Sequence, residues 1–309
     1  LFRKSSIMFR TRSFIMAMNV KQASEKWNIS DNYQIRTQLI NQKYGGYYTQ
    51  EELREIVAYA SQRNIEVIPE IDMPGHSKSI GTVHPDIRCN YTLDTSTTNG
   101  IDVRDVWRVA KEENYQLIED IVKELVDIFP SEYIHIGGDE VNFKWWKECP
   151  DCQQLMIEKG LKDHFQLEQH FVNRVSDILS KYGKKSMVWD EAVDGGLLPT
   201  TTMVTGWRGV KQCLGTTEKG YPTIIMPSSV FYLDKRQYPH DRGHNSRNGL
   251  SLKTICDFTF EDAGFSEAQR KNVAGIEGAF WSEIYLSNVF SDRHFSDYLE
   301  YMLLVLHLR

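Results

Sequence analysis

The feature that most constrains the fold is an alternation of short apolar segments with helix-like segments. Amphipathic periodicity predicts helices over residues 49–62, 104–129 and 163–181, and a last helix begins near Phe295. The apolar segments have the length of strands that are buried on both faces. Strands that alternate with helices favour a parallel sheet with helical crossovers. Six segments have this character: Ile65–Asp72, Tyr133–Glu140, Ser186–Glu191, Thr202–Trp207, Thr223–Met226 and Ala274–Trp281.

A parallel sheet of this kind is either closed into a barrel or open and doubly wound. Four of the predicted strands end in acidic or aromatic residues, namely Asp72, Glu140, Glu191 and Trp281. A barrel gathers its functional residues at these C-terminal strand ends. The doubly wound alternative calls for a glycine-rich phosphate loop, but Gly137-Gly138 is followed by two carboxylates that would repel phosphate. The pattern therefore favours an α/β fold of the (β/α)8 TIM-barrel type.

An eight-stranded barrel needs two further strands, and we expect them within residues 1–44. Ser5–Met18 and Ser24–Asn32 are the candidate segments, and no helix of normal length fits between them. The last predicted helix is short, because the sequence ends at Arg309. We therefore expect a single catalytic barrel domain over residues 1–309, incomplete at both ends, with an abbreviated first β/α unit and a truncated last helix.

Composition limits the classes of partner. The chain of 309 residues has a net charge of −6, and 12% of its residues are aromatic. A disordered chain would have fewer aromatic residues, and an acidic chain is a poor ligand for nucleic acid or an anionic membrane. No apolar run reaches the length of about 18 residues that a membrane span requires. We expect a globular protein with no nucleic-acid partner and no membrane span; a homodimer is an arrangement that the sequence leaves open.

The cysteines give a weak signal for a metal site. Cys149 and Cys152 form a lone C-x-x-C pair among five cysteines. Zinc sites of this type usually need a second pair. The sequence therefore favours a local disulfide or two free thiols, and we expect no metal and no cofactor.

The sharpest chemical feature is the acidic pair Asp139-Glu140. It ends an apolar strand directly after Gly137-Gly138, which let the backbone turn or let a ligand approach closely. Apolar surroundings raise the pKa of a carboxyl group, which suits a general acid. The alternative is a solvated junction between a strand and a loop.

A second polar cluster follows the preceding strand. Glu70, Asp72 and His76 lie within one segment that also contains Pro74-Gly75. The imidazole could pair with an acid and tune its protonation. Taken alone, a Pro-Gly turn with a hydrogen-bonded histidine is the better interpretation.

Aromatic residues recur at the strand ends. Trp189, Trp207 and Trp281 each lie where a predicted strand ends. Any single tryptophan is more often part of the core, but three on one face of a barrel favour a pocket that stacks on a sugar ring. Three neighbouring residues could bind sugar hydroxyl groups: Tyr232, Asp234 and Glu283.

Together these motifs resemble glycoside hydrolase family 20, the β-N-acetylhexosaminidases, with the chitobiase-like enzymes as the nearest type. The resemblance covers about residues 45–285, and its motifs occur in the family's order. The motifs are Pro69-Glu-Ile-Asp-Met-Pro-Gly-His76, His135-Ile-Gly-Gly-Asp-Glu140, Val188-Trp-Asp-Glu191, Thr205-Gly-Trp-Arg208, Tyr232-Leu-Asp234 and Trp281-Ser-Glu283.

The resemblance implies a role for each candidate residue. Glu140 matches the general acid/base, and Asp139 matches the residue that orients the substrate's 2-acetamido group. Tyr232 matches the hydroxyl that holds the acetamido oxygen while this oxygen attacks C1, so that an oxazolinium ion forms and configuration is retained. The remaining residues match the pocket wall (Trp189, Trp207, Trp281), the groups that bind outer hydroxyls (Asp234, Glu283), and a supporting pair (His76, Asp31).

The implied activity is that of an exo-β-N-acetylhexosaminidase, a glycoside hydrolase that removes terminal non-reducing GlcNAc or GalNAc. Its partner would be an oligosaccharide or glycoconjugate that ends in N-acetylhexosamine, and the family is mostly secreted, periplasmic or lysosomal. In the second-strand segment Lys26 and Asn28 replace expected histidines around Trp27, and no arginine near Ile7 matches the family's sugar-clamping residue. The alternative is therefore a catalytically impaired or sugar-binding homologue. A family 18 chitinase is disfavoured, because its Asp-x-x-Asp-x-Asp-x-Glu run is absent from the sequence.

Overall fold

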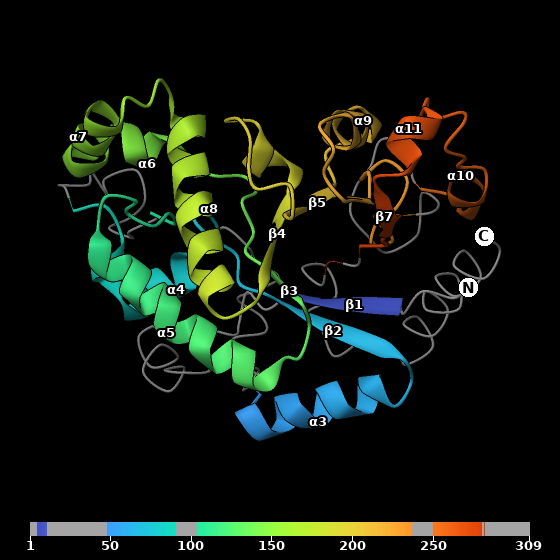
Figure 1. Ribbon diagram of the computed structural model, residues 1–309, viewed down its shortest axis with the longest axis horizontal. Helices are drawn as coiled ribbons and strands as arrows, with labels where there is room; N and C mark the ends of the chain where they lie inside the picture. The colour runs from blue at the N-terminus through green and yellow to red at the C-terminus, as the bar shows by residue number, and fades with distance from the viewer. Residues whose placement is uncertain (1–4, 11–47, 91–103, 237–249, 280, 282–309) are drawn as a thin grey trace. The chain divides into compact units, whose positions relative to one another are not determined.

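The computed structural model describes residues 5–10, 48–90, 104–236, 250–279 and 281 (Figure 1). These residues belong to two compact units, one with described residues up to Met203 and one from Val204 onward. In both units the strands run parallel and follow one another in chain order.

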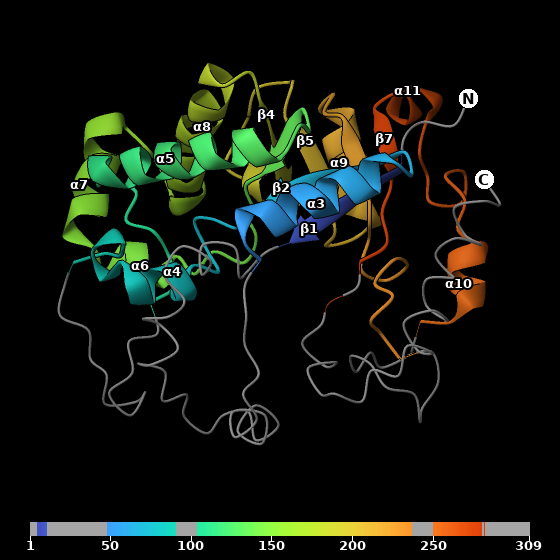
Figure 2. The ribbon, with the colours of Figure 1, turned by 90° about the horizontal axis from the view of Figure 1, so that it is seen from below.

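The first unit is a parallel sheet covered by helices. Its strands are β1 (Ser5–Arg10), β2 (Ile65–Glu70), β3 (Tyr133–His135) and β4 (Lys185–Trp189). Three helices cover this sheet: α3 (Gln50–Ser61), α5 (Glu112–Ile128) and α8 (His164–Lys181). Helix α3 packs on β2 and α8 packs on β4. Helix α5 lies between α3 and α8 and contacts both (Figures 1 and 2). Strand, helix and parallel strand therefore succeed one another, as in a barrel.

Two of these helices begin where local sequence chemistry predicts. The Thr49 side chain accepts a hydrogen bond from the Glu52 backbone at 3.2 Å, and Glu52 Oε2 accepts one from the Thr49 backbone at 2.6 Å. This capping box satisfies backbone donors that the first helical turn leaves without partners. Asp163 caps α8 in a similar way through the Gln166 backbone at 2.9 Å. The predicted helices over 49–62 and 163–181 are thus confirmed.

The helix predicted over 104–129 begins later than expected, at Glu112. The Trp107 backbone donates to the Pro74 carbonyl at 3.0 Å, and its indole Nε1 donates to Ser77 Oγ at 2.8 Å. Trp107 is fully buried by these contacts. The prediction was wrong over residues 104–111 because a contact with a segment distant in sequence, and not helical periodicity, decides their conformation.

Shorter elements complete the first unit. The segment after β2 contains α4 (Lys78–Val83) and the 3-10 helix η2 (Pro85–Ile87), and the segment after β3 contains α6 (Lys144–Lys147) and α7 (Pro150–Lys159). A 3-10 helix, η4 (Asp190–Val193), follows β4 directly.

The second unit repeats the same local pattern. Its strands are β5 (Met203–Gly206, from Val204 in this unit), β6 (Thr223–Ile225) and β7 (Val273–Ile276). Helix α9 (Val210–Glu218) connects β5 to β6, and two short helices precede β7: α10 (Leu252–Cys256) and α11 (Glu267–Arg270).

All six strand segments predicted from the sequence overlap an observed strand, and two of the strands begin one residue earlier than predicted. The predicted segment Ser5–Met18 contains β1, whereas Ser24–Asn32 and the helix from Phe295 lie outside the described residues. The single-domain organisation over 1–309 stays a prediction. Among the described helices, none is both long and apolar enough to cross a membrane.

Candidate active site

Backbone hydrogen bonds continue beyond the C-terminal ends of β2, β3 and β4. Ile71 N donates to His135 O at 2.8 Å, Met73 N to Ile136 O at 3.1 Å, and Trp189 N to Gly137 O at 2.9 Å. Segments that follow three separate strands are thereby fixed side by side. This end of the sheet is where a barrel places its catalytic groups.

The backbone turns sharply at the acidic pair. Gly137 and Gly138 have positive φ angles of 80° and 91°, and Glu140 has a φ of 51°. A positive φ is unfavourable for a residue with a side chain and is found preferentially at functional sites. The turn places the two carboxyl groups in different environments: Asp139 is buried and Glu140 is exposed. Adjacent acids therefore have the unlike environments that distinct catalytic roles require.

Gly137 is required at this turn for steric reasons. A Cβ atom there would collide with the Asp72 carboxylate and would lie 2.7 Å from Met73 N. We expect Gly137→Ala to lower the free energy of unfolding by about 2–4 kcal/mol, from backbone strain and overpacking together. Gly183→Ala is the matched control, since Gly183 also has a positive φ of 70° but no atom lies within 4 Å of its Cβ position. Equal losses in the two variants, measured by chemical denaturation, would contradict the steric explanation.

His76 contacts both members of the acidic pair. Its Nε2 atom lies 3.4 Å from Asp139 Oδ2 and 3.2 Å from Glu140 Oε2, within ion-pair distance. Burial disfavours the charged imidazolium, but the contacts with Asp139 and Glu140 and the charge of Asp72 outweigh it and raise the pKa of His76 to about 10. The imidazolium form therefore holds the two carboxylates together near neutral pH.

The raised pKa of His76 predicts a pH dependence of stability. A folded-state pKa of about 10 against an ordinary value of 6.5 means that the stabilisation is fully present below 6.5 and is lost as the pH rises toward 10. The difference in free energy of unfolding between the wild type and His76→Gln should thus be largest at about pH 6 and smaller at about pH 9. Thermal or urea unfolding of both proteins across this range measures it, and a difference that does not change with pH would overturn the assignment.

Asp72, His76 and Asp139 also have ligand atoms within 4.8 Å of one another, a spacing that a metal site could use. The same groups also form an ion-paired cluster, in which His76 Nε2 lies 3.4 Å from Asp139 Oδ2.

Glu191 is a site residue to which the sequence motifs assign no role. Its Oε2 accepts a hydrogen bond from the Glu140 backbone N–H at 3.2 Å. The residue lies in η4, directly after β4, and so links the acidic pair to the next strand. Its position at the end of a predicted strand was a signal that Glu191 belongs to the site. Its hydrogen bond with the Glu140 backbone could not be predicted from the sequence.

Trp189 is fully buried, and its indole Nε1 donates to Glu70 Oε1 at 3.1 Å. Its ring also packs against His135, with ring centroids 4.7 Å apart, and His135 Nδ1 accepts a hydrogen bond from Gly137 N at 3.1 Å. Glu70 and His135 therefore position both the tryptophan and the glycine turn. The indole ring of Trp189 therefore has a fixed orientation in the first unit.

The second unit contains an aromatic cluster made of Trp207, Tyr232 and Trp281. The rings of Trp207 and Tyr232 are stacked with centroids 6.1 Å apart, and those of Tyr232 and Trp281 are tilted at the same separation. All three side chains are partly exposed. The three aromatic residues that the sequence singled out after β5, β6 and β7 thus lie together.

Backbone hydrogen bonds hold the segment that carries Tyr232 and Asp234. Leu233 N donates to Ala279 O at 2.7 Å, and Ala279 N donates to Phe231 O at 2.8 Å. Asp234 is fully buried, so its carboxylate is an element of a fixed structure and not of a solvated loop. Glu277 directly follows β7, and desolvation raises the pKa of its carboxyl group to about 7. Asp31 and Glu283, the other two predicted site residues, lie outside the described residues.

Both units carry their polar and aromatic side chains after parallel strands, which is where barrel enzymes place their functional residues. Residues 16–296 match the family described as glycosyl hydrolase family 20, catalytic domain. The chain therefore belongs to glycosyl hydrolase family 20, and both the resemblance and the predicted TIM-barrel fold class are confirmed.

Known relatives agree with this assignment. A β-hexosaminidase of Porphyromonas gingivalis is 38% identical over 65% of this chain and 26% of its own length, and one of Vibrio furnissii is 33% identical over 80% of this chain and 41% of its own length. The solved exo-β-N-acetylglucosaminidase of Vibrio harveyi in complex with N-acetylglucosamine is 29% identical with a TM-score of 0.70, and the match covers 86% of this chain and 46% of the other. The chain thus spans less than half the length of these three relatives.

Proposed function

We propose that the protein is an exo-β-N-acetylhexosaminidase that removes terminal non-reducing GlcNAc or GalNAc with retention of configuration. The observation that carries the proposal is the Asp139-Glu140 turn, in which a buried and an exposed carboxyl group follow one strand and share the ion-paired His76. Membership of glycosyl hydrolase family 20, with β-hexosaminidases among the relatives, supports it.

The proposed mechanism uses the substrate's own acetamido oxygen as nucleophile. Retaining glycosidases with a protein nucleophile place two carboxyl groups about 5 Å apart on opposite sides of the bond. Neighbouring residues at one strand end do not provide such a pair. In the proposed reaction Glu140 protonates the glycosidic oxygen, the acetamido oxygen attacks C1, and an oxazolinium ion forms. Glu140 then accepts a proton from the water that opens this ion.

Each remaining residue has a defined part in this proposal. Asp139 orients the acetamido N–H and stabilises the positive charge that develops on it. Tyr232 donates a hydrogen bond to the acetamido oxygen. Trp189, Trp207 and Trp281 form the wall around the sugar, while Asp234 and Glu283 bind outer hydroxyl groups. Asp31 is the proposed acidic partner of His76.

The substrate class follows from the family and from the aromatic residues. Tryptophan and tyrosine rings stack on the apolar face of a sugar ring, and the three rings of the second unit lie close enough to share one ligand. The Vibrio harveyi relative was solved with N-acetylglucosamine bound. An oligosaccharide or glycoconjugate that ends in N-acetylhexosamine is therefore the proposed substrate.

Release of a chromophore from aryl N-acetyl-β-glucosaminide and N-acetyl-β-galactosaminide tests the function directly. Turnover of one or both, with retention of configuration in the first-formed product, is the expected result. A folded chain that binds N-acetylglucosamine without turnover would instead be a sugar-binding homologue. An active chain that a thiazoline mimic of the oxazolinium ion fails to inhibit would refute the substrate-assisted mechanism.

A further inference from the structure

Three cysteines from two distant segments of the first unit meet in its interior. Cys89 follows η2, whereas Cys149 caps the N-terminus of α7 and Cys152 lies in the first turn of that helix. Their Sγ atoms all lie within 4.8 Å of one another, and Cys89 and Cys152 are separated by 3.9 Å. All three side chains are almost completely buried. We call this group the three-cysteine cluster.

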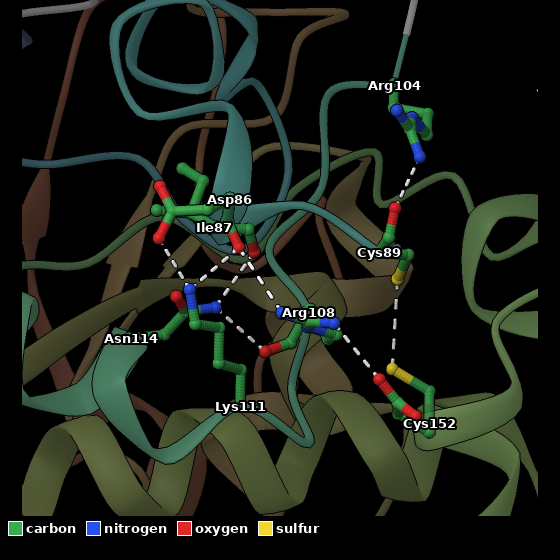
Figure 3. A network of polar contacts seen from close by, with 9 residues as sticks. Asp86, Ile87, Cys89, Arg104, Arg108, Lys111, Asn114 and Cys152 are labelled. Atoms are coloured by element: carbon green, nitrogen blue, oxygen red, sulfur yellow. Dashed lines mark hydrogen bonds and ion pairs between the residues drawn. The ribbon is translucent and has the colours of Figure 1, made fainter. Parts of the chain in front are cut away.

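A network of hydrogen bonds fixes the position of Cys89 (Figure 3). Asn114 Nδ2 donates to the carbonyls of Ile87 at 2.8 Å and Arg108 at 2.9 Å, and Arg108 N donates to Ile87 O at 2.8 Å. Lys111 Nζ binds the Asp86 carboxylate at 2.6 Å. The backbone that carries Cys89 is thereby held before any ligand binds.

The other two cysteines are held by the start of α7. Cys149 N donates to Trp146 O at 3.2 Å, and Gln153 N donates to Cys149 O at 3.0 Å. Trp146, which is fully buried, donates from its indole to the Trp107 carbonyl at 2.9 Å. Arg108 reaches this helix as well, through an ion pair with Asp151 at 3.0 Å. Both sides of the three-cysteine cluster are therefore rigid.

We propose that the three-cysteine cluster binds one thiophilic divalent metal ion, such as Zn²⁺, through the thiolates of Cys89, Cys149 and Cys152. In a tetrahedral zinc–thiolate site with bonds of about 2.3 Å, neighbouring sulfur atoms lie about 3.8 Å apart. The Cys89–Cys152 distance of 3.9 Å corresponds to that spacing. Among the described residues no fourth Cys, His or carboxylate joins the group, so these three thiolates are the ligands that we propose.

A disulfide explains the same geometry less well. It would join two of the sulfur atoms at about 2.05 Å and leave the third thiol buried beside the bond. A thiol in that position can attack the disulfide and exchange with it. A metal ion would bind all three sulfur atoms, which already lie within 4.8 Å of one another, and would neutralise the charge of the buried thiolates.

The chemistry of the ligands sets how binding depends on pH. Cysteine binds a metal ion only as the thiolate, so protons must leave the cluster as the metal enters. Metal affinity should consequently rise with pH.

The metal would connect two loops that carry candidate active-site residues. Cys89 belongs to the segment after β2 that also carries His76, and Cys149 and Cys152 follow the Asp139-Glu140 turn after β3. A bound ion would thus stabilise the relative placement of these segments. It would take no part in the reaction, and the metal proposal does not depend on the proposed enzymatic function.

Metal titration of the reduced, chelator-treated full chain tests the proposal. We expect one Zn²⁺ per chain by native mass spectrometry, a rise in the thermal unfolding midpoint, and, with Co²⁺ as probe, the strong absorption of cobalt–thiolate bonds. Each of Cys89→Ser, Cys149→Ser and Cys152→Ser should weaken Zn²⁺ binding by about 100-fold or more. Cys213→Ser is the matched control, because Cys213 is equally buried but donates to Gly206 O in the second unit, and it should bind Zn²⁺ as the wild type does.

The wild-type measurements keep the test valid if a cluster variant fails to fold. A reduced, folded wild type that binds no Zn²⁺ and shows no cobalt–thiolate absorption would overturn the proposal. So would metal binding that Cys213→Ser loses to the same extent as the cluster variants. Peptide mapping of the unreduced protein that finds a full-occupancy disulfide within the cluster would also overturn it.

Discussion

Replacing Glu140 with Gln should lower kcat for an aryl N-acetyl-β-glucosaminide by about three orders of magnitude. The side chain keeps its size, but an amide can neither protonate the glycosidic oxygen nor later accept a proton from water. KM should change little, because the lost interaction belongs mainly to the transition state. Steady-state kinetics of the purified variant measures both parameters.

A matched control separates this loss from a general effect of removing a carboxylate. Glu148 is also exposed, and it follows α6 in the same connection between β3 and α8. Glu148→Gln should therefore retain the wild-type kcat. Substrates with better leaving groups need less protonation, so the defect of Glu140→Gln should shrink as the leaving group improves. A defect that is independent of the leaving group would show that Glu140 is not the acid.

The fold could be predicted largely from local patterns. Apolar runs such as Tyr133–Ile136 and Ser186–Trp189 mark the strands, and the capping residues Thr49 and Asp163 fix the starts of two helices. These signals are local, because a strand's burial and a helix's first hydrogen bonds depend on neighbouring residues. The start of α5 could not be read in this way, since Trp107 is held by Pro74 and Ser77 from another part of the chain.

The candidate site was predictable in composition but not in its contacts. Asp139, Glu140 and His76 were found as polar residues at strand ends, and the structure brings these three together. That His76 lies between both acids, and that Glu191 accepts from the Glu140 backbone, depends on the side-by-side placement of three strands. Sequence periodicity assigns residues to elements but does not fix such pairings.

The contact of Cys89 with Cys149 and Cys152 could not be predicted from the sequence either. The lone C-x-x-C pair of Cys149 and Cys152 argued against a metal site, because a second ligand pair was absent from the sequence pattern. The third sulfur comes from a segment before α5 and joins the pair only through the fold. A ligand set divided between distant segments leaves no spacing motif.

Asp139→Asn should lower kcat by about 100-fold or more, through a cause different from that of Glu140→Gln. Asp139 is buried, so its charge acts in surroundings that screen it weakly. In the proposed mechanism this charge stabilises the positive acetamido group of the transition state, and an asparagine removes the charge while keeping the shape. The decisive measurement is the affinity for a thiazoline mimic of the oxazolinium ion.

Asp139→Asn should weaken binding of the mimic by about the same factor as kcat, while binding of the product N-acetylglucosamine changes much less. Glu140→Gln should show the smaller effect on the mimic, because the general acid does not contact the acetamido group. Asp177→Asn, on the exposed face of α8, is the control for loss of a negative charge and should behave as wild type. Equal weakening of mimic and product by Asp139→Asn would assign Asp139 to ground-state binding, because only a charge matched to the transition state discriminates between the two ligands.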